Sequence, residues 1–163
     1  MSGLVAARLA ELGIELPQVS APVANYVPTR RSGNLLIVSG QLPVAPGQTP
    51  PTGILGADTS IDDGVAAARQ CGLNILAHAS AALGGDLDRI TAVLRLGIFV
   101  ASTPTFTDHP KVGNGASDLM VEVLGDAGAH ARAAVGVAAL PFGVPVEIEA
   151  MFEVSEQWAH PPG

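Results

Sequence analysis

The sequence is poor in aromatic residues, in cysteine and in long apolar runs. Aromatic residues make up 4% of the 163 residues while hydrophobic residues make up 48%, so the core is expected to consist of Ala, Val, Leu and Ile. The single cysteine, Cys71, cannot form an internal disulfide, and we expect it to be buried packing in a reducing, cytoplasmic protein. No apolar run approaches the roughly 20 residues that span a bilayer, so no membrane partner is predicted.

Positive charge is also scarce. Eight Lys and Arg stand against fifteen Asp and Glu, which gives a formal net charge of −7 and an isoelectric point near 4.8. A nucleic-acid-binding surface needs a basic patch that releases counterions from phosphates. We therefore expect no nucleic-acid partner. The N-terminus carries acids and an arginine within its apolar pattern, which is not typical of a signal peptide.

Apolar periodicity predicts two long helices. After Ser60, a potential N-cap, apolar residues recur at intervals of three and four until Gly84-Gly85, and acidic residues occupy the first turn. A second helix is predicted from about Asp108 to Gly125 on the same spacing. A shorter amphipathic helix is predicted over residues 4–12.

Strands are predicted on either side of these helices, at residues 25–30, 35–39 and 90–100, with a closing hairpin around Phe142-Gly143. Because both apolar stripes need a sheet face to cover them, we predict an α/β (α+β) fold, a mixed sheet with two long helices packed on one face. We divide the chain into an N-terminal helical extension and linker at 1–20, one domain at 21–154 and a C-terminal tail at 155–163.

The segment from His130 to Val154 contains the strongest candidates for chemistry. Arg132 lies among Ala, Val and Gly, where a cation is costly to bury unless it meets an anion. Strand alternation places Glu147 and Glu149 on the same face of their strand. From the residues alone two interpretations stay open: a solvated face of a half-buried hairpin, and a ligand site.

The predicted hairpin places limits on such a site. If the chain turns at Phe142-Gly143, Arg132 lies opposite Glu153, and Arg132 and Glu147 are separated by about 20 Å, at ~3.4 Å per residue. One small ligand could not contact both residues in a single chain. A site that uses both must therefore be shared between two copies of the chain.

The other candidates are weaker. For His78 in the long helix and for His109 at the start of the second helix we favour structural roles, whereas His130 lies beside Arg132 and is worth testing. The histidines do not have the spacing of metal ligands, so no metal is predicted. The sequence contains no phosphate-binding glycine loop, no dinucleotide fingerprint and no G-x-S-x-G elbow.

Several sequence blocks, in order, resemble the RidA/YjgF family of reactive-intermediate (enamine/imine) deaminases, also described as endoribonuclease L-PSP-like. The resemblance runs from about Tyr26 to Val154. It is carried by Tyr26-Val27, LLIVSGQLP at residues 35–43, NIL and LGGDLD at residues 74–76 and 83–88, Ala131-Arg132, and VEIEA at residues 146–150.

The resemblance implies a chorismate-mutase-like fold and a homotrimer with ligand sites between subunits. It also implies cofactor-independent hydrolysis of 2-enamine or 2-imino acids to 2-oxo acids and ammonia. Arg132 would hold the substrate carboxylate and Glu147 would activate water. The other implied substrate-binding residues are Tyr26, Ser39, Gly40 and Asn114.

The alternative is a non-catalytic trimer that binds small carboxylates or 2-oxo acids. Three departures from the family pattern indicate a divergent subgroup: the N-terminal extension, a longer loop at residues 43–56, and His130-Ala131-Arg132 in place of the more usual proline-containing approach to the arginine.

Overall fold

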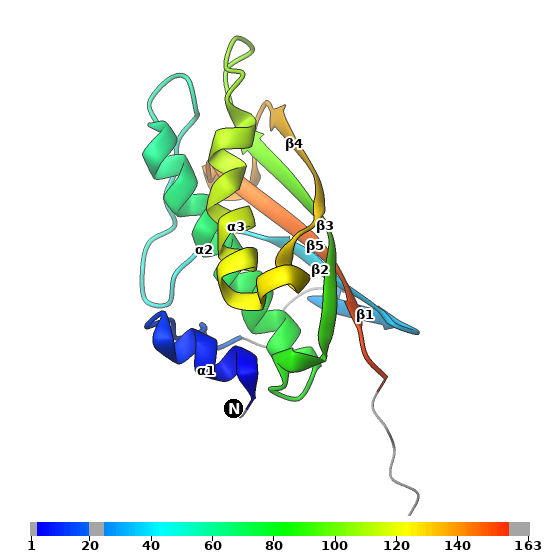
Figure 1. The fold of residues 1–163 in the computed structure, drawn as a ribbon. Helices are drawn as coiled ribbons and strands as arrows, with labels where there is room; N and C mark the ends of the chain where they lie inside the picture. The colour runs from blue at the N-terminus through cyan, green and yellow to red at the C-terminus, as the bar shows by residue number, and fades with distance from the viewer. Residues whose placement is uncertain (1–2, 20–24, 157–163) are drawn as a thin grey trace, which may run out of the picture.

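A five-stranded mixed sheet carries the long helices on one face (Figure 1). The structure, a computed structural model, describes residues 3–19 and 25–156. The strand order is β1-β2-β5-β3-β4. The elements are α1 (Leu4–Glu11), β1 (Thr29–Ser32), β2 (Leu35–Gln41), α2 (Ile61–Ala82), β3 (Ile90–Ala101), α3 (His109–Leu124), β4 (Ala131–Val137) and β5 (Val146–Val154). The predicted fold class is confirmed.

Helix α2 begins and ends at the residues that its sequence signals indicate. The Ser60 hydroxyl accepts a hydrogen bond from the Asp63 backbone N–H at 3.1 Å, as expected of an N-cap. Past the other end, Gly84 and Gly85 take positive φ angles of 68° and 89°, a conformation that glycine adopts without steric cost. The periodic stripe between these signals is the face that α2 buries.

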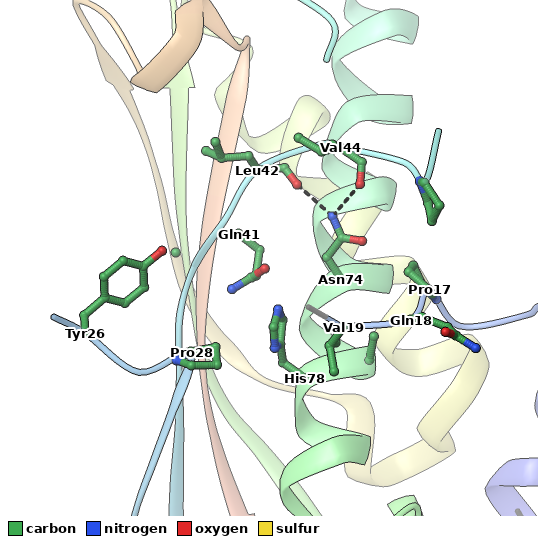
Figure 2. A pocket seen from close by; sticks show the side chains of 13 residues that line it. Pro17, Gln18, Val19, Tyr26, Pro28, Gln41, Leu42, Val44, Asn74 and His78 are labelled. Carbon is green, nitrogen blue, oxygen red and sulfur yellow. Dashed lines mark hydrogen bonds between the residues drawn. The ribbon is translucent and has the colours of Figure 1, made fainter. Parts of the chain in front are cut away.

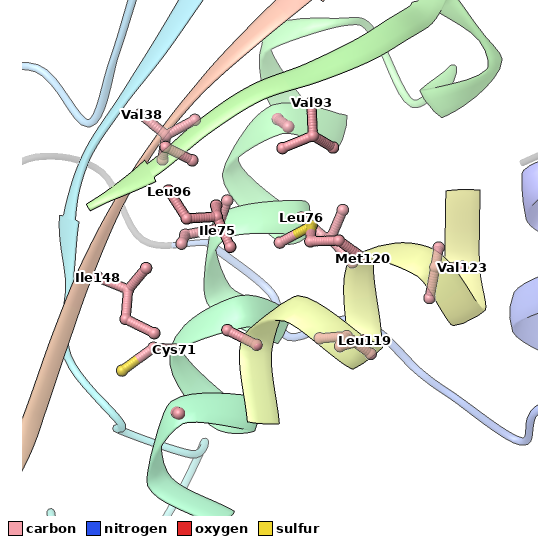
Figure 3. Close-up of a cluster of buried hydrophobic side chains, with 14 of the residues drawn as sticks. Val38, Cys71, Ile75, Leu76, Val93, Leu96, Leu119, Met120, Val123 and Ile148 are labelled. Atoms are coloured by element: carbon pink, nitrogen blue, oxygen red, sulfur yellow. The ribbon is translucent and has the colours of Figure 1, made fainter. Parts of the chain in front are cut away.

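The core lies between the two long helices and the sheet (Figure 3). Cys71 is fully buried there, as predicted. The helices approach each other closely because α3 has a glycine at the crossing. A Cβ on Gly115 would overlap the Val65 carbonyl oxygen and lie 3.1 Å from the Arg69 backbone nitrogen. The sheet contributes Val38, Leu96 and Ile148, α2 contributes Ile75 and Leu76, and α3 contributes Leu119 and Met120.

The predicted closing hairpin is wrong. β3 lies between β4 and β5, with Leu96 paired to Arg132 in a parallel ladder and to Ala150 in an antiparallel ladder. Residues 138–145 do not form a tight turn, because they cross the end of β3, where the Pro145 carbonyl accepts a hydrogen bond from the Ala101 N–H at 2.9 Å. The left-handed Phe142, with φ 57°, and the glycine that follows it lie within this crossing.

The N-terminal helix α1 is attached to the domain by side-chain contacts. The Asp88 carboxylate accepts hydrogen bonds from the Leu4 and Val5 N–H groups at 2.8 and 2.9 Å. Arg8 donates to the Glu122 carbonyl at 2.9 Å. The predicted helix at residues 4–12 is confirmed, whereas parts of the predicted linker (20–24) and tail (157–163) lie outside the described residues. Among the described helices, none is long and apolar enough to cross a membrane.

Candidate functional site

Arg132 lies on β4, at the edge of the sheet, and faces the helices. One guanidinium nitrogen, Nη1, donates to the Ser117 hydroxyl at 3.0 Å, and Nη2 donates to the Pro110 carbonyl at 3.3 Å. Both acceptors belong to α3 and both are neutral. Among the described residues, no carboxylate forms an ion pair with Arg132 within 4.0 Å. The guanidinium is therefore fixed in position while its charge remains free for an anion.

A short hydrogen-bond chain orients the hydroxyl that holds Arg132. The His130 ring contacts the Gly128 carbonyl through Nδ1 at 2.6 Å, and a carbonyl can only accept, so Nδ1 donates. In the neutral ring Nε2 then accepts from the Ser117 hydroxyl, at 2.9 Å. This arrangement leaves the Ser117 oxygen free to accept from Arg132. His130, the histidine singled out from the sequence, is thus part of the support of Arg132.

Glu147 lies on the opposite face of the sheet, on β5. It lies directly over Gly40, where a Cβ would overlap its Oε1 atom. Burial, together with the negative charge of Glu149, raises the pKa of Glu147 above its ordinary value. Glu149 itself forms an ion pair with Arg95 at 3.2 Å. A half-buried carboxyl with a raised pKa is suited to exchanging protons with water.

The structure does not bring Arg132 and Glu147 together in one chain. Arg132 is level with Ala150, three residues from Glu147, and β3 separates the two strands. From strand spacing the two residues lie about 14 Å apart, on opposite faces. The interpretation that both line one solvated hairpin face is therefore wrong. The inference that one small ligand cannot contact both residues in one chain holds, for a different geometric reason.

A pocket of about 410 Å³ opens beside the end of β2 (Figure 2). Two predicted substrate-binding residues, Tyr26 and Gly40, line it. Ser39 supports the pocket from outside, because its hydroxyl donates to the Val27 carbonyl at 2.9 Å and so fixes the segment that carries Tyr26. Asn114 is not in this pocket. It lies on α3 one helical turn from Ser117, near Arg132 at the other edge of the sheet.

Sequence reasoning missed three polar residues of this pocket, Gln41, Asn74 and His78. The Asn74 amide donates to the Leu42 and Val44 carbonyls at 2.8 and 3.1 Å and holds the chain that leaves β2 against α2. Burial lowers the pKa of His78 and so favours its neutral ring. The four-residue spacing of Asn74 and His78 puts both on one side of α2, but it does not reveal what they face.

Comparisons with known proteins agree with this architecture. The sequence model of the YjgF/chorismate-mutase-like family matches residues 6–149. The chain belongs to this family. Protein TCP17 of Trypanosoma cruzi is 51% identical over 155 residues, which cover 94% of this chain and 96% of that protein.

Solved structures separate into nearer and more distant relatives. Atu1372 of Agrobacterium tumefaciens, a protein of unknown function, is 50% identical with a TM-score of 0.85. The aligned region covers 93% of this chain and 94% of the Atu1372 chain. RidA of the Antarctic bacterium Psychrobacter is 31% identical with a TM-score of 0.56, and the aligned region covers 85% of this chain and 94% of the RidA chain. The difference places this chain in a subgroup that has diverged from RidA.

Proposed function

We propose that the protein hydrolyses reactive 2-enamine or 2-imino acids to 2-oxo acids and ammonia. A 2-enamine first becomes the imine by taking a proton on its third carbon and releasing one from nitrogen. Water then adds to the imine carbon, the carbon–nitrogen bond breaks and the nitrogen leaves as ammonia. A protonated imine is already an electrophile, so this proposal requires no cofactor. It is supported by membership of a family that includes RidA and by the placement of Arg132 and Glu147.

The observation that carries the proposal is the state of Arg132. Its guanidinium is oriented by two neutral acceptors and forms no ion pair among the described residues. A carboxylate that approaches it would form charge-assisted hydrogen bonds with a preorganised donor. This role suits the carboxylate that every 2-imino acid carries.

Glu147 is proposed as the group that takes a proton from the attacking water. Its raised pKa brings it nearer to the pH range in which a general base works best. In the second role, as acid, the same carboxyl would return a proton to the departing nitrogen. Glu149 is less suited, because it is already paired with Arg95.

We further propose that the site forms between copies of the chain in a homotrimer. Arg132 and Glu147 face opposite sides of one sheet, so a second copy has to supply one of them. The face of the sheet away from the helices also exposes apolar side chains, among them Ile37 at 42% and Val135 at 46%. An apolar surface of this kind is typical of a protein–protein contact.

The decisive experiment measures imine hydrolysis by two variants and their mixture. The imine is generated freshly from leucine by an L-amino acid oxidase, and the rate above spontaneous hydrolysis is recorded. Arg132→Ala and Glu147→Gln should each lose about 100-fold or more. When the two are coexpressed in equal amounts, random mixing restores both groups in about a quarter of shared sites. No recovery in verified mixed oligomers would rule out a shared site.

Glu153→Gln is the matched control, because Glu153 lies on the same face of β5 and remains exposed. It should hydrolyse the imine at the wild-type rate. The second candidate function is binding of small carboxylates without turnover. It would be favoured if 2-oxo acids bind in calorimetry while the imine hydrolyses no faster than in buffer, since a binder needs Arg132 but not Glu147.

The family description also names an endoribonuclease. We propose no nucleic-acid partner, because the net charge of −7 repels phosphates.

A further inference from the structure

The pocket beside β2 contains hydrogen-bonding groups that the proposed chemistry does not use. Gln41 and His78 extend into it from two different elements, and Tyr26 lines it from across the chain at the end of β2 (Figure 2). Within residues 3–19 and 25–156, neither the Tyr26 hydroxyl nor the His78 ring makes a hydrogen bond to protein, and Gln41 uses only its amide nitrogen, which donates to the Ser39 carbonyl at 3.1 Å. These groups are available to a ligand.

Hydrogen bonds fix one wall of this pocket. The Asn74 amide is fully engaged, because Nδ2 donates to the Leu42 and Val44 carbonyls and Oδ1 accepts from Gln70 at 3.1 Å. This contact joins α2 to the chain after β2 on one side of the pocket. Several of the remaining lining residues are apolar: Pro17, Val19, Pro28, Val44, Pro46 and Ala77. The pocket therefore combines one fixed wall with an apolar surround and a few polar groups, a lining typical of small-molecule sites.

Among the residues that the structure describes, no side chain that lines this pocket carries a permanent charge. His78 is disposed to stay neutral, because burial lowers its pKa. Glu147 lies on the far side of Gly40 and is not among the lining residues. A charged ligand group that entered would lose its water without gaining an opposite charge, which is unfavourable.

We propose that this pocket binds an uncharged, hydroxyl-bearing side chain of the substrate, with His78 and Gln41 as specificity residues. The inference rests on the proposed function, since the pocket adjoins Gly40 and through it Glu147. A hydroxyl both donates and accepts on one atom. Gln41 Oε1 accepts, and a neutral imidazole offers one donor and one acceptor, so a hydroxyl matches both residues. A site built to bond a hydroxyl discriminates strongly against the analogue without it.

The test compares ligands that differ by one oxygen. Dissociation constants of 4-hydroxyphenylpyruvate and phenylpyruvate are measured by calorimetry for wild type and for His78→Phe, which keeps a planar ring but cannot form hydrogen bonds. Wild type should bind the hydroxyl compound about tenfold or more tightly. In His78→Phe that preference should fall to about twofold or less while phenylpyruvate binds as before. His109→Phe, a histidine outside the pocket, should retain the preference.

A third probe separates this inference from the proposed function. p-Cresol carries the hydroxyl-bearing ring without a carboxylate, and its contact with the pocket is followed through the ring signals of His78 by NMR. If both 2-oxo acids bind equally tightly and His78→Phe changes nothing, the pocket inference is wrong while the role of Arg132 stands. If neither 2-oxo acid binds but p-cresol shifts the His78 signals, the pocket recognises the hydroxyl-bearing ring as inferred, while the proposal that Arg132 holds a carboxylate fails. No shift with any of the three probes would overturn the inference.

Discussion

Replacing Gly40 with alanine should abolish most imine hydrolysis with little loss of stability. An added Cβ would overlap Glu147 Oε1 and lie 3.1 Å from its Cδ and 3.3 Å from its Cγ. These three nearest atoms belong to the end of one flexible side chain, with no backbone atom among them. Gly40 does not have a positive φ, so alanine can adopt its backbone conformation. The change therefore acts on the position of Glu147.

The size of the effect follows from the contact distances. Ordinary carbon–carbon contact needs about 3.5–4.0 Å, so the carboxylate has to move by about 1 Å or more. A displacement of that size costs a catalytic group about 100-fold in rate. Moving one side chain off its preferred rotamer costs only about 0.5–1.5 kcal/mol in the free energy of unfolding.

The assay is imine hydrolysis, with thermal unfolding recorded on the same preparation. Gly97→Ala is the matched control, because its Cβ would displace the end of Glu149 in the same way, with Oε1 at 2.7 Å. Gly40→Ala should be slow and Gly97→Ala close to wild type. Combining Gly40→Ala with Glu147→Gln should add no further loss, because both changes remove the same group. Wild-type turnover by Gly40→Ala would show that the carboxylate over Gly40 is not the catalytic one.

Three further predictions concern charge and packing. Arg132→Lys should lower kcat/KM about 30- to 150-fold, because lysine cannot present a planar two-pronged donor. Wild-type activity in a destabilised protein would instead show that Arg132 has a structural role. Folding raises the pKa of Glu147, so the stability that its protonated carboxyl contributes is lost as pH rises through that pKa. The melting temperature of Glu147→Gln should therefore exceed that of wild type at about pH 8, and the difference should disappear by about pH 4. An equal shift in the exposed control Glu15→Gln would contradict this. Gly115→Ala should lower the free energy of unfolding, measured by chemical denaturation, by about 1–3 kcal/mol, because the added Cβ meets the Val65 carbonyl. An equal loss in the control Asn114→Ala, at an exposed position, would contradict this explanation.

The helices and most strands could be predicted because their signals are local. The cap at Ser60 and the glycines after α2 fix that helix without reference to the rest of the chain. The order of the strands is not local. Read together, β3, α3 and β4 are a strand–helix–strand unit, which normally sets its two strands parallel. The Phe142-Gly143 pair is typical of a hairpin turn and so predicted one. The prediction was wrong because the strand–helix–strand unit, and not this local turn, determines which strands pair.

The residues of the candidate site likewise divide into those that have a local sequence signal and those that do not. Arg132 and Glu147 could be found because a charge in an apolar strand is costly and therefore conspicuous. His78 and Gln41 could not, because their pocket is assembled from the segment before β1, the end of β2, the chain after β2 and α2. An isolated histidine on a helix carries no such signal. The role of such a histidine depends on tertiary contacts, which cannot be predicted from the sequence alone.

The two halves of the candidate site constrain how copies can associate. Arg132 lies on the edge strand β4, and the pocket lies beside β2, next to the opposite edge of a five-stranded sheet. The strands between them separate the two regions by about 14 Å, at ~4.8 Å for each strand. If the Arg132 edge of one copy meets the pocket edge of the next, each contact is head-to-tail, and such contacts either close into a ring or continue as a filament. A closed ring provides one site for each chain, which is the arrangement that the proposed trimer requires.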